Sequence, residues 1–218
     1  ARDLAFGDDM VIGTRTGQTD VNVADSELVF VGYGVDAPEQ NWNDYAGLDV
    51  TGKTVVILVN DPGFHAQDAT LFGGERMTYY GRWTYKFEEA ARKGAAAALI
   101  VHDTPGASYG WDVVKNSWSG AQFDLRAEDD PEPRLPAQGW ITGEVAAQLF
   151  ADAGLDLFVR QNGFAHRQPG YIVLTVSLKP IAGVPGDMSD AQMRAFADIA
   201  ELYSFDELRV SHAQNLVL

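Results

Sequence analysis

The clearest hydrophobic pattern lies at residues 81–103, which read as an amphipathic helix followed by a buried strand. Residues 83–93 gather apolar side chains on one stripe, and Gly94 is expected to end the helix in the left-handed conformation. Residues 95–101 then return as a strand that packs on the helix through small side chains. The stripe consists of Tyr85, Phe87, Ala90 and Ala91, and the charged face of Lys86, Glu88, Glu89, Arg92 and Lys93.

Two further strands are predicted before this helix. Residues 19–35 alternate and condense into an apolar run at 28–31, which ends at Gly32 and Gly34. The turn at 51–53 leads into residues 54–60, whose β-branched side chains suit a central strand buried on both faces. A parallel strand–helix–strand unit should cross over with the right-handed connection. The pattern therefore predicts an α/β module.

The rest of the chain alternates long irregular segments with shorter regular ones. Residues 61–81 and 104–139 are rich in turn-forming residues and are predicted to be long loops. Helices are predicted at 143–153 and 190–203, a strand at 171–178 and a linker at 180–185. Ser189 is the predicted N-cap of the last helix. The apolar side of this helix, residues 190–203, is predicted to contain Met193, Phe196, Ala197, Ala200 and Leu202.

Composition narrows the classes of protein that fit this pattern. The chain has 218 residues, 46% of them hydrophobic, enough for a sizeable core. Its net charge of −15 and isoelectric point of about 4.4 argue against binding nucleic acid or an anionic membrane surface. Cysteine is absent, which removes disulfides, thiolate metal sites and cysteine nucleophiles. No apolar run reaches the ~20 residues of a membrane span, and no signal peptide is visible at the start.

Motifs for cofactors and metals are weak. Residues 32–37 fit G-x-G-x-x-A after a strand, but Pro38 follows and no amphipathic helix is predicted there, so a turn is the favoured interpretation. The four histidines are scattered, and His102 and Asp103 should point to opposite faces of a strand. No calcium loop of the EF-hand type occurs, and nothing positively supports a paired-carboxylate hydrolase. We therefore predict no catalytic residue, no cofactor site and no metal site in this chain.

Aromatic clusters in the two long segments are the candidate contact residues. Large aromatic side chains together with Arg and Asn are enriched in binding hot spots. They either contact a peptide, a partner or a small molecule, or they cover the open ends of a small barrel, and the sequence leaves these alternatives open. The residues are Met77, Tyr79, Tyr80, Arg82 and Trp83 in the first segment, and Asn116 and Trp118 in the second.

Several segments together resemble the protease-associated (PA) domain inserted in bacterial zinc aminopeptidases. They are LVFVGYGV, NDYAGLDVTGKTVVILVNDPGF, MTYYGRWTYKFEEAARKGAAAALIVHD and VVKNSWSG, and the resemblance covers roughly residues 20–178. It implies a swivelling β/β/α fold, a partly closed sheet or barrel flanked by helices. It also implies an accessory or lid module that contacts the catalytic domain of a peptidase or its peptide substrate, in the periplasm or outside the cell.

In that family the two zinc ions and the general base belong to the peptidase core, whose ligand motifs this sequence lacks, so the resemblance implies no peptidase activity for this chain. A fragment of a working aminopeptidase, whose core lies outside this sequence, is the alternative. The predicted organisation is an N-terminal extension at 1–19, a PA-like domain at 20–179, and a linker with a C-terminal helix and tail at 180–218. The last eight residues, SHAQNLVL, are faintly similar to the strand that resumes the peptidase core.

Overall fold

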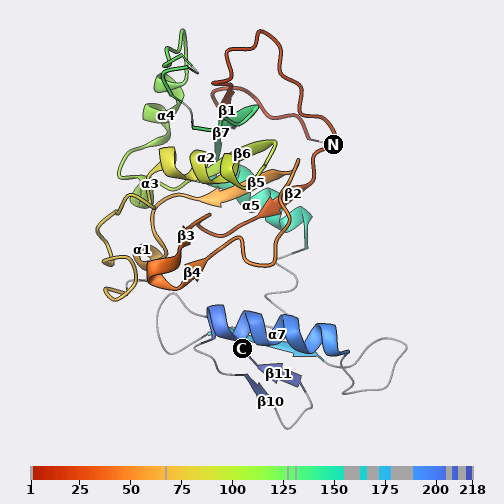
Figure 1. Ribbon diagram of the computed structural model, residues 1–218. Coiled ribbons are helices and arrows are strands. Elements are labelled where there is room, and N and C mark those ends of the chain that lie inside the picture. Colours follow the sequence, from red (N-terminus) through yellow and green to blue (C-terminus); the bar gives the residue numbers. More distant parts are fainter. Residues whose placement is uncertain are drawn as a thin grey trace. The chain divides into compact units, whose positions relative to one another are not determined.

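The structure is a computed structural model. The chain folds into two compact units, Ala1–Leu149 and Phe150–Leu218 (Figure 1). The structure describes residues 2–66, 68–126, 128–130, 132–154, 163–165, 172–177, 189–204, 208–210 and 215–217.

The first unit is built on a five-stranded sheet in the order β1-β7-β6-β5-β2. Strands β2, β5, β6 and β7 run parallel, and β1 pairs antiparallel with β7 at one edge. Over the described residues the sheet stays open and does not close into a barrel. The predicted α/β class is confirmed. The strands are β1 Met10–Gly13, β2 Leu28–Phe30, β5 Thr54–Leu58, β6 Ala97–His102 and β7 Ala137–Thr142.

The centre of the sheet is β6, and not the strand predicted there from residues 54–60. That segment forms β5, which lies between β6 and β2 and is buried along four of its five residues. Its β-branched residues correctly indicated burial on both faces, but a buried strand next to the centre has the same composition as a central one. The parallel pairing of β5 and β6 around helix α2 is as predicted.

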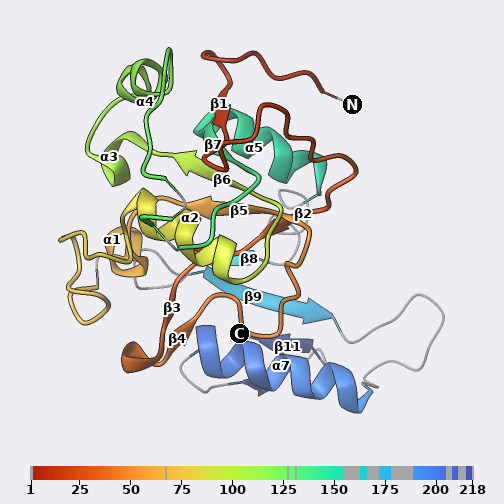
Figure 2. The same ribbon diagram turned by 45° about the horizontal axis from the view of Figure 1, so that its top comes forward.

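Two helices lie on opposite faces of this sheet, α2 at Trp83–Arg92 and α5 at Gly143–Asp152 (Figures 1 and 2). Alternate strand residues such as Val55, Ile57 and Ile100 join Phe87 and Ala90 of α2 in the main hydrophobic core. Helix α2 stops where predicted, because Gly94 adopts a φ of +80° that other residues rarely accept.

The predicted charged face of α2 is wrong at two positions. Lys86 is completely buried and Glu89 nearly so, whereas Glu88, Arg92 and Lys93 are partly or fully open to solvent. The loops that follow β2 and β5 reach over this side of the helix and supply acceptors for the Lys86 ammonium. Helical periodicity cannot anticipate such coverage, because it comes from segments distant in sequence.

The segments predicted as long loops contain short elements. Residues 61–81 include α1 Pro62–Ala66, and residues 104–139 include α3 Thr104–Ala107, α4 Trp111–Ser117 and the start of β7. Tertiary packing holds them, as buried Val114 shows for α4. After β2 the chain makes β3 Asp36–Ala37, the 3-10 helix η1 Pro38–Gln40 and β4 Trp42–Asn43, so no long helix follows Gly32 and Gly34.

The second unit contains a four-stranded antiparallel sheet in the order β10-β11-β9-β8 and helix α7, Asp190–Tyr203. Ser189 caps α7 as predicted, with a full capping box to Gln192. Ala200 is buried and Phe196 partly so, but Met193 and Ala197 are exposed, contrary to their predicted place on the apolar side. The predicted linker at 180–185 and the Leu202 side chain lie outside the described part. The strands are β8 Gly163–Ala165, β9 Ile172–Ser177, β10 Arg209–Val210 and β11 Asn215–Val217.

Candidate functional site

Helix α2 brings one tryptophan of each predicted contact segment to the same buried ring. Trp83, in its first turn, packs edge-on against Phe87 with ring centroids 6.1 Å apart. Trp118, the C-cap residue of α4, packs against the same ring at 6.2 Å. Trp83 is 40% exposed, whereas Trp118 is partly buried against the main core. The two segments therefore meet through Phe87.

Tyr79 and Tyr80 pack on a second ring of the same helix, Tyr85, with centroids 5.6 and 5.0 Å away. Tyr80 donates its hydroxyl proton to Glu39 and belongs to a smaller hydrophobic cluster with Phe72. The Tyr79 hydroxyl donates to Glu88 (2.7 Å), yet 55% of this residue remains exposed. Tyr80 is thus largely part of the packing, while Tyr79 presents its ring to solvent.

A buried carboxylate closes the loop that carries these tyrosines. Asp61, fully buried after β5, accepts the Thr78 amide at 2.5 Å and the Thr78 hydroxyl at 2.9 Å. Gly81 lies directly against this closure, since a Cβ there would come within 2.8 Å of Met77 Cγ and 3.0 Å of the Asp61 carboxyl group. A side chain at position 81 would therefore force half-buried Met77 or the Asp61 carboxyl group to shift.

The remaining predicted contact residues are both exposed. Arg82 is the N-cap residue of α2, and Asn116 lies on α4, two residues before the packed Trp118. The structure therefore separates the seven predicted residues into two groups. Tyr79, Arg82, Trp83 and Asn116 are open to solvent, whereas Met77, Tyr80 and Trp118 are partly buried behind them.

A polar array that the sequence reading missed lies at the carboxyl ends of the parallel strands. His65 of α1 accepts or donates at both ring nitrogens, with Nδ1 2.9 Å from the Tyr33 hydroxyl and Nε2 2.9 Å from Asp103 Oδ2. Asp103 follows β6 and also accepts the Gly106 amide as the cap of α3. Parallel strands commonly place functional groups at this edge, so polar residues just after each predicted strand were an available signal.

The order hydroxyl, imidazole, carboxylate is the one used to activate nucleophiles. Here burial raises the pKa of the Tyr33 phenol to about 12, so the phenol stays protonated at neutral pH. With Asp103 accepting from Nε2–H, Nδ1 accepts the Tyr33 proton, which assigns the tautomer of His65. The array links the loops that follow β2, β5 and β6.

A buried lysine lies beneath this array. Lys86 Nζ donates to the carbonyls of Tyr33 (2.6 Å) and Asn60 (3.0 Å), and lies 5.9 Å from the centroid of the Tyr33 ring. Burial lowers the pKa of Lys86 to about 7, against the opposing attraction of Asp61 and Asp44. The ammonium therefore joins the ends of β2 and β5 at the centre of the fold.

Asp44 is the second buried group with a displaced pKa. Its carboxylate accepts the Val35 amide and the Trp42 indole N–H, both at 3.0 Å. Burial nevertheless raises its pKa to about 6. The polar centre of this unit is thus a set of ionisable groups held by the fold. Across the described ranges, no group of three or more His, Asp or Glu side chains could hold a metal ion.

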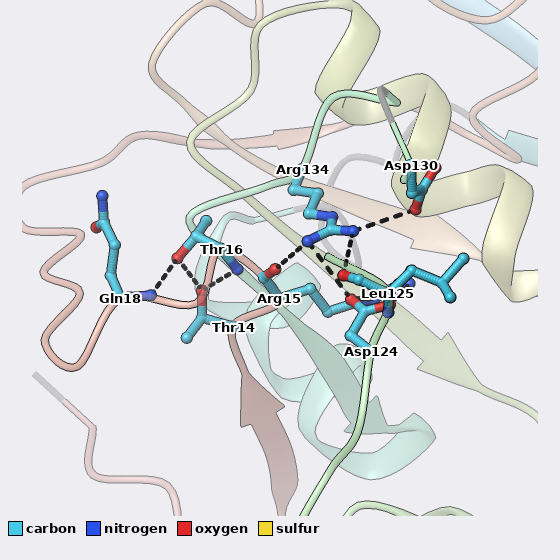
Figure 3. A network of polar contacts seen from close by, with 8 residues as sticks. All are labelled: Thr14, Arg15, Thr16, Gln18, Asp124, Leu125, Asp130 and Arg134. Carbon is cyan, nitrogen blue, oxygen red and sulfur yellow. Dashed lines mark hydrogen bonds and ion pairs between the residues drawn. The ribbon is translucent and has the colours of Figure 1, made fainter. Parts of the chain in front are cut away.

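A separate network ties the N-terminal segment to the acidic loop before β7 (Figure 3). Arg15 forms a two-pronged ion pair with Asp124, and Arg134 donates to the carbonyls of Arg15 and Leu125. Arg134 also pairs with Asp130. The network leaves Phe123 on the loop 94% exposed. None of the helices in the described part is long and apolar enough to cross a membrane.

Comparisons with known proteins give two distant similarities. Residues 165–218 match the family model of the nitrite/sulfite reductase ferredoxin-like half domain, and this range includes the last part of the segment predicted to be PA-like, 20–179, and all of residues 180–218. An aminopeptidase from Aneurinibacillus sp. strain AM-1 is similar with a TM-score of 0.30 and 14% identity, over 84% of this chain and 37% of that one. The chain therefore spans 37% of that aminopeptidase's length. No curated protein matches the sequence.

Proposed function

We propose that the first unit is a non-catalytic module of the PA type, accessory to a zinc aminopeptidase, which contacts a peptide substrate or the peptidase catalytic domain. The supporting sequence is the set of segments that resemble PA domains. The observation that carries the proposal is the pair Tyr79 and Trp83, which are 55% and 40% exposed although each is fixed on a ring of α2.

Fixed, exposed aromatic rings favour contact over simple coverage of the fold. A ring that only sealed the end of the sheet would be buried, as Tyr80 and Trp118 largely are. Tyr79 and Trp83 instead contact the protein along one edge and leave the remainder in water. Because they are already ordered, a partner that covers them loses little side-chain entropy on binding. Aromatic side chains of this kind dominate binding energies in protein interfaces.

In this proposal catalysis and its zinc ions belong to a core outside this sequence. Among the described residues no group of three or more His, Asp or Glu side chains could hold a metal ion, and the neighbouring side chains of His65 and Asp103 are already engaged within the fold. The extracytoplasmic location is part of the same proposal and comes from the resemblance alone. The acidic chain is compatible with a peptide or a protein as partner, and not with nucleic acid.

Binding of blocked peptides tests the contact. A library of random nonapeptides, acetylated and amidated at their ends, is titrated into the 15N-labelled protein while the five indole N–H signals are followed by NMR. We expect the Trp83 signal to shift most and the Trp118 signal to shift less. The signal of buried Trp140 should not shift. Trp83→Ala should weaken binding at least fivefold, whereas Phe123→Ala, which removes another exposed ring, should not. Equal effects of the two variants, or no shift at all, would contradict the proposal.

Hydrolysis tests the non-catalytic part. With zinc present, the chain should release no nitroaniline from leucine p-nitroanilide. Turnover that co-purifies with the protein, and that is lost when His65 and Asp103 are both replaced by alanine, would assign catalysis to this chain instead.

The family match supports a different origin for the second unit. We propose that residues 165–218 form a separate module related to the nitrite/sulfite reductase half domain, joined to the PA-like unit. This proposal is supported by the match itself, which begins at the end of β8 and extends to residue 218. Two thermal transitions are expected, of which only one should move in Trp118→Ala. A single cooperative transition for the whole chain would oppose two independent modules.

A further inference from the structure

Two arginines break the charge pattern of the protein. In a chain with net charge −15, carboxylates are abundant, and the exposed cations of the described residues generally pair with one. Arg76 and Arg82 are exposed, yet neither makes an ion pair or a side-chain hydrogen bond in the part of the chain that the structure describes. Cations paired with carboxylates include Arg15, Lys53, Arg92, Lys93, Lys115, Arg126, Arg134 and Arg194.

Both arginines flank the exposed aromatic rings. Met77, which follows Arg76 in the chain, lies close to Gly81, which precedes Arg82, since a Cβ at Gly81 would come within 2.8 Å of Met77 Cγ. The Arg82 amide donates to the Tyr79 carbonyl (3.2 Å), so the chain turns tightly between the two residues. Trp83 follows Arg82 directly as the first residue of α2. Uncompensated positive charge and exposed aromatic surface therefore occupy one short segment, 76–83.

This combination determines the ligand chemistry. A guanidinium binds a carboxylate through two parallel hydrogen bonds, and an aromatic ring packs against an apolar or aromatic side chain. Glu88, which accepts the Tyr79 hydroxyl, sets a negative charge beside the ring. A second carboxylate near Tyr79 would be repelled, so a ligand with one carboxylate fits better than a polyacidic one.

We propose that Arg82, with Arg76, Tyr79 and Trp83, binds a peptide through a single carboxylate that neighbours an aromatic side chain. The inference rests on the proposed peptide contact and adds the chemistry that the contact recognises. The carboxylate comes either from the C-terminus of the peptide or from an Asp or Glu side chain.

Four defined peptides test the proposal in a buffer of low ionic strength. They are acetyl-Gly-Gly-Phe as the free acid, the same peptide as its amide, acetyl-Gly-Asp-Phe-amide, and acetyl-Gly-Gly-Ala as the free acid. We expect the first peptide to bind about tenfold more tightly than its amide, the effect of one charge-assisted pair. The alanine peptide should bind at least fivefold more weakly than the first. Binding of the aspartate peptide at the strength of the first extends the site to side-chain carboxylates, and its failure to bind restricts the site to C-termini.

Matched arginine variants separate a site from the general field of the protein. Arg82→Gln should abolish the difference between free acid and amide, and Arg82→Lys should retain part of it. Arg126→Gln removes an exposed guanidinium that pairs with Glu128 and should leave the difference intact. NMR spectra of each variant confirm that the fold is retained.

Three results would overturn the inference. The first is equal binding of the free acid and the amide. The second is an equal loss of binding in Arg82→Gln and Arg126→Gln. The third is that none of the four peptides binds. Equal binding of acid and amide that is still lost in Trp83→Ala would leave the proposed peptide contact standing without its carboxylate chemistry. Failure of the random nonapeptides, in contrast, bears on the proposed function itself.

Discussion

Lys86 and Trp83 lie on the same helix, three positions apart, and each occupies the environment expected of the other. The lysine is completely buried, whereas the tryptophan is 40% exposed. Lys86 is enclosed because loops after β2 and β5 cover its side of α2 and present two carbonyl acceptors. Trp83 packs against Phe87 and is otherwise open.

The difference separates residues that stabilise the fold from residues available for contact. A buried ammonium without acceptors would be strongly unfavourable, so Lys86 and its partners depend on each other. An exposed ring gains little stability in the isolated chain, so its exposure is tolerated at low cost. The two regions should therefore respond oppositely to substitution, with stability changing at one and binding at the other.

The largest effect is expected for Lys86→Met. It leaves the Tyr33 and Asn60 carbonyls without their donor and removes the positive charge between Asp44 and Asp61. We expect the free energy of unfolding, measured in urea, to fall by about 3–5 kcal/mol. Lys93→Met is the control on the same helix, where the exposed pair with Asp36 should be worth about 1 kcal/mol or less. Similar losses in both variants would remove the distinction.

The buried charges should also give stability an opposed dependence on pH. Asp44 has its pKa raised from 3.8 to about 6, so between these pH values the folded state holds a proton that the unfolded chain has lost. The contribution of Asp44 to stability should therefore fall by about 2–3 kcal/mol as the pH rises through that window. Lys86 has its pKa lowered from 10.5 to about 7, so stability should rise with pH between 7 and 10.5.

Urea unfolding at a series of pH values checks both slopes. In a plot of unfolding free energy against pH, Asp44→Asn should reduce the slope on the acid side, and Lys86→Met should reduce the slope on the alkaline side. Both changes in slope are expected whatever each substitution does to stability at a single pH. If the stability of the wild type fell no more steeply than that of Asp44→Asn between pH 4 and 6, hydrogen bonds to Asp44 would outweigh its burial.

Asp103→Ala should have a moderate effect. The substitution removes the acceptor of His65 and the cap of α3, and we expect a loss of about 1–2 kcal/mol. Tyr33→Phe, which deletes only the hydroxyl bonded to His65, should cost about 1 kcal/mol. A larger loss for Tyr33→Phe than for Asp103→Ala would mean that the array is organised by the phenol and not by the carboxylate.

The smallest stability effect should be that of Trp83→Ala, at about 1 kcal/mol or less, since the ring is largely exposed. Trp118→Ala should cost about 2 kcal/mol, because that ring packs against the main core. Melting temperatures of the two variants give the comparison. Binding of the blocked peptides should respond in the reverse order, and an equal loss of melting temperature in both would favour a structural role for each ring.

Much of the fold could be predicted from neighbouring residues. The span of α2, its end at Gly94, the strand that follows and the cap of α7 at Ser189 all depend on contacts within one or two turns. Strands β1 and β7 were missed, because the short segments MVIG and AQGWIT carry weak patterns and are stabilised by pairing with each other. The seven candidate contact residues were identified by type, while their division into exposed and partly buried groups depends on packing.

The sequence by itself determined the α/β class, the order of its main elements and the aromatic segment at the start of α2, because short-range periodicity and turn chemistry specify these. Only the tertiary structure decided that Lys86 is enclosed, that His65 meets Asp103, and that Arg76 and Arg82 find no ion-pair partner among the described residues. Each of these depends on which distant loops come together over the sheet. No local pattern encodes that, because the energy that selects it comes from contacts between segments far apart in the chain.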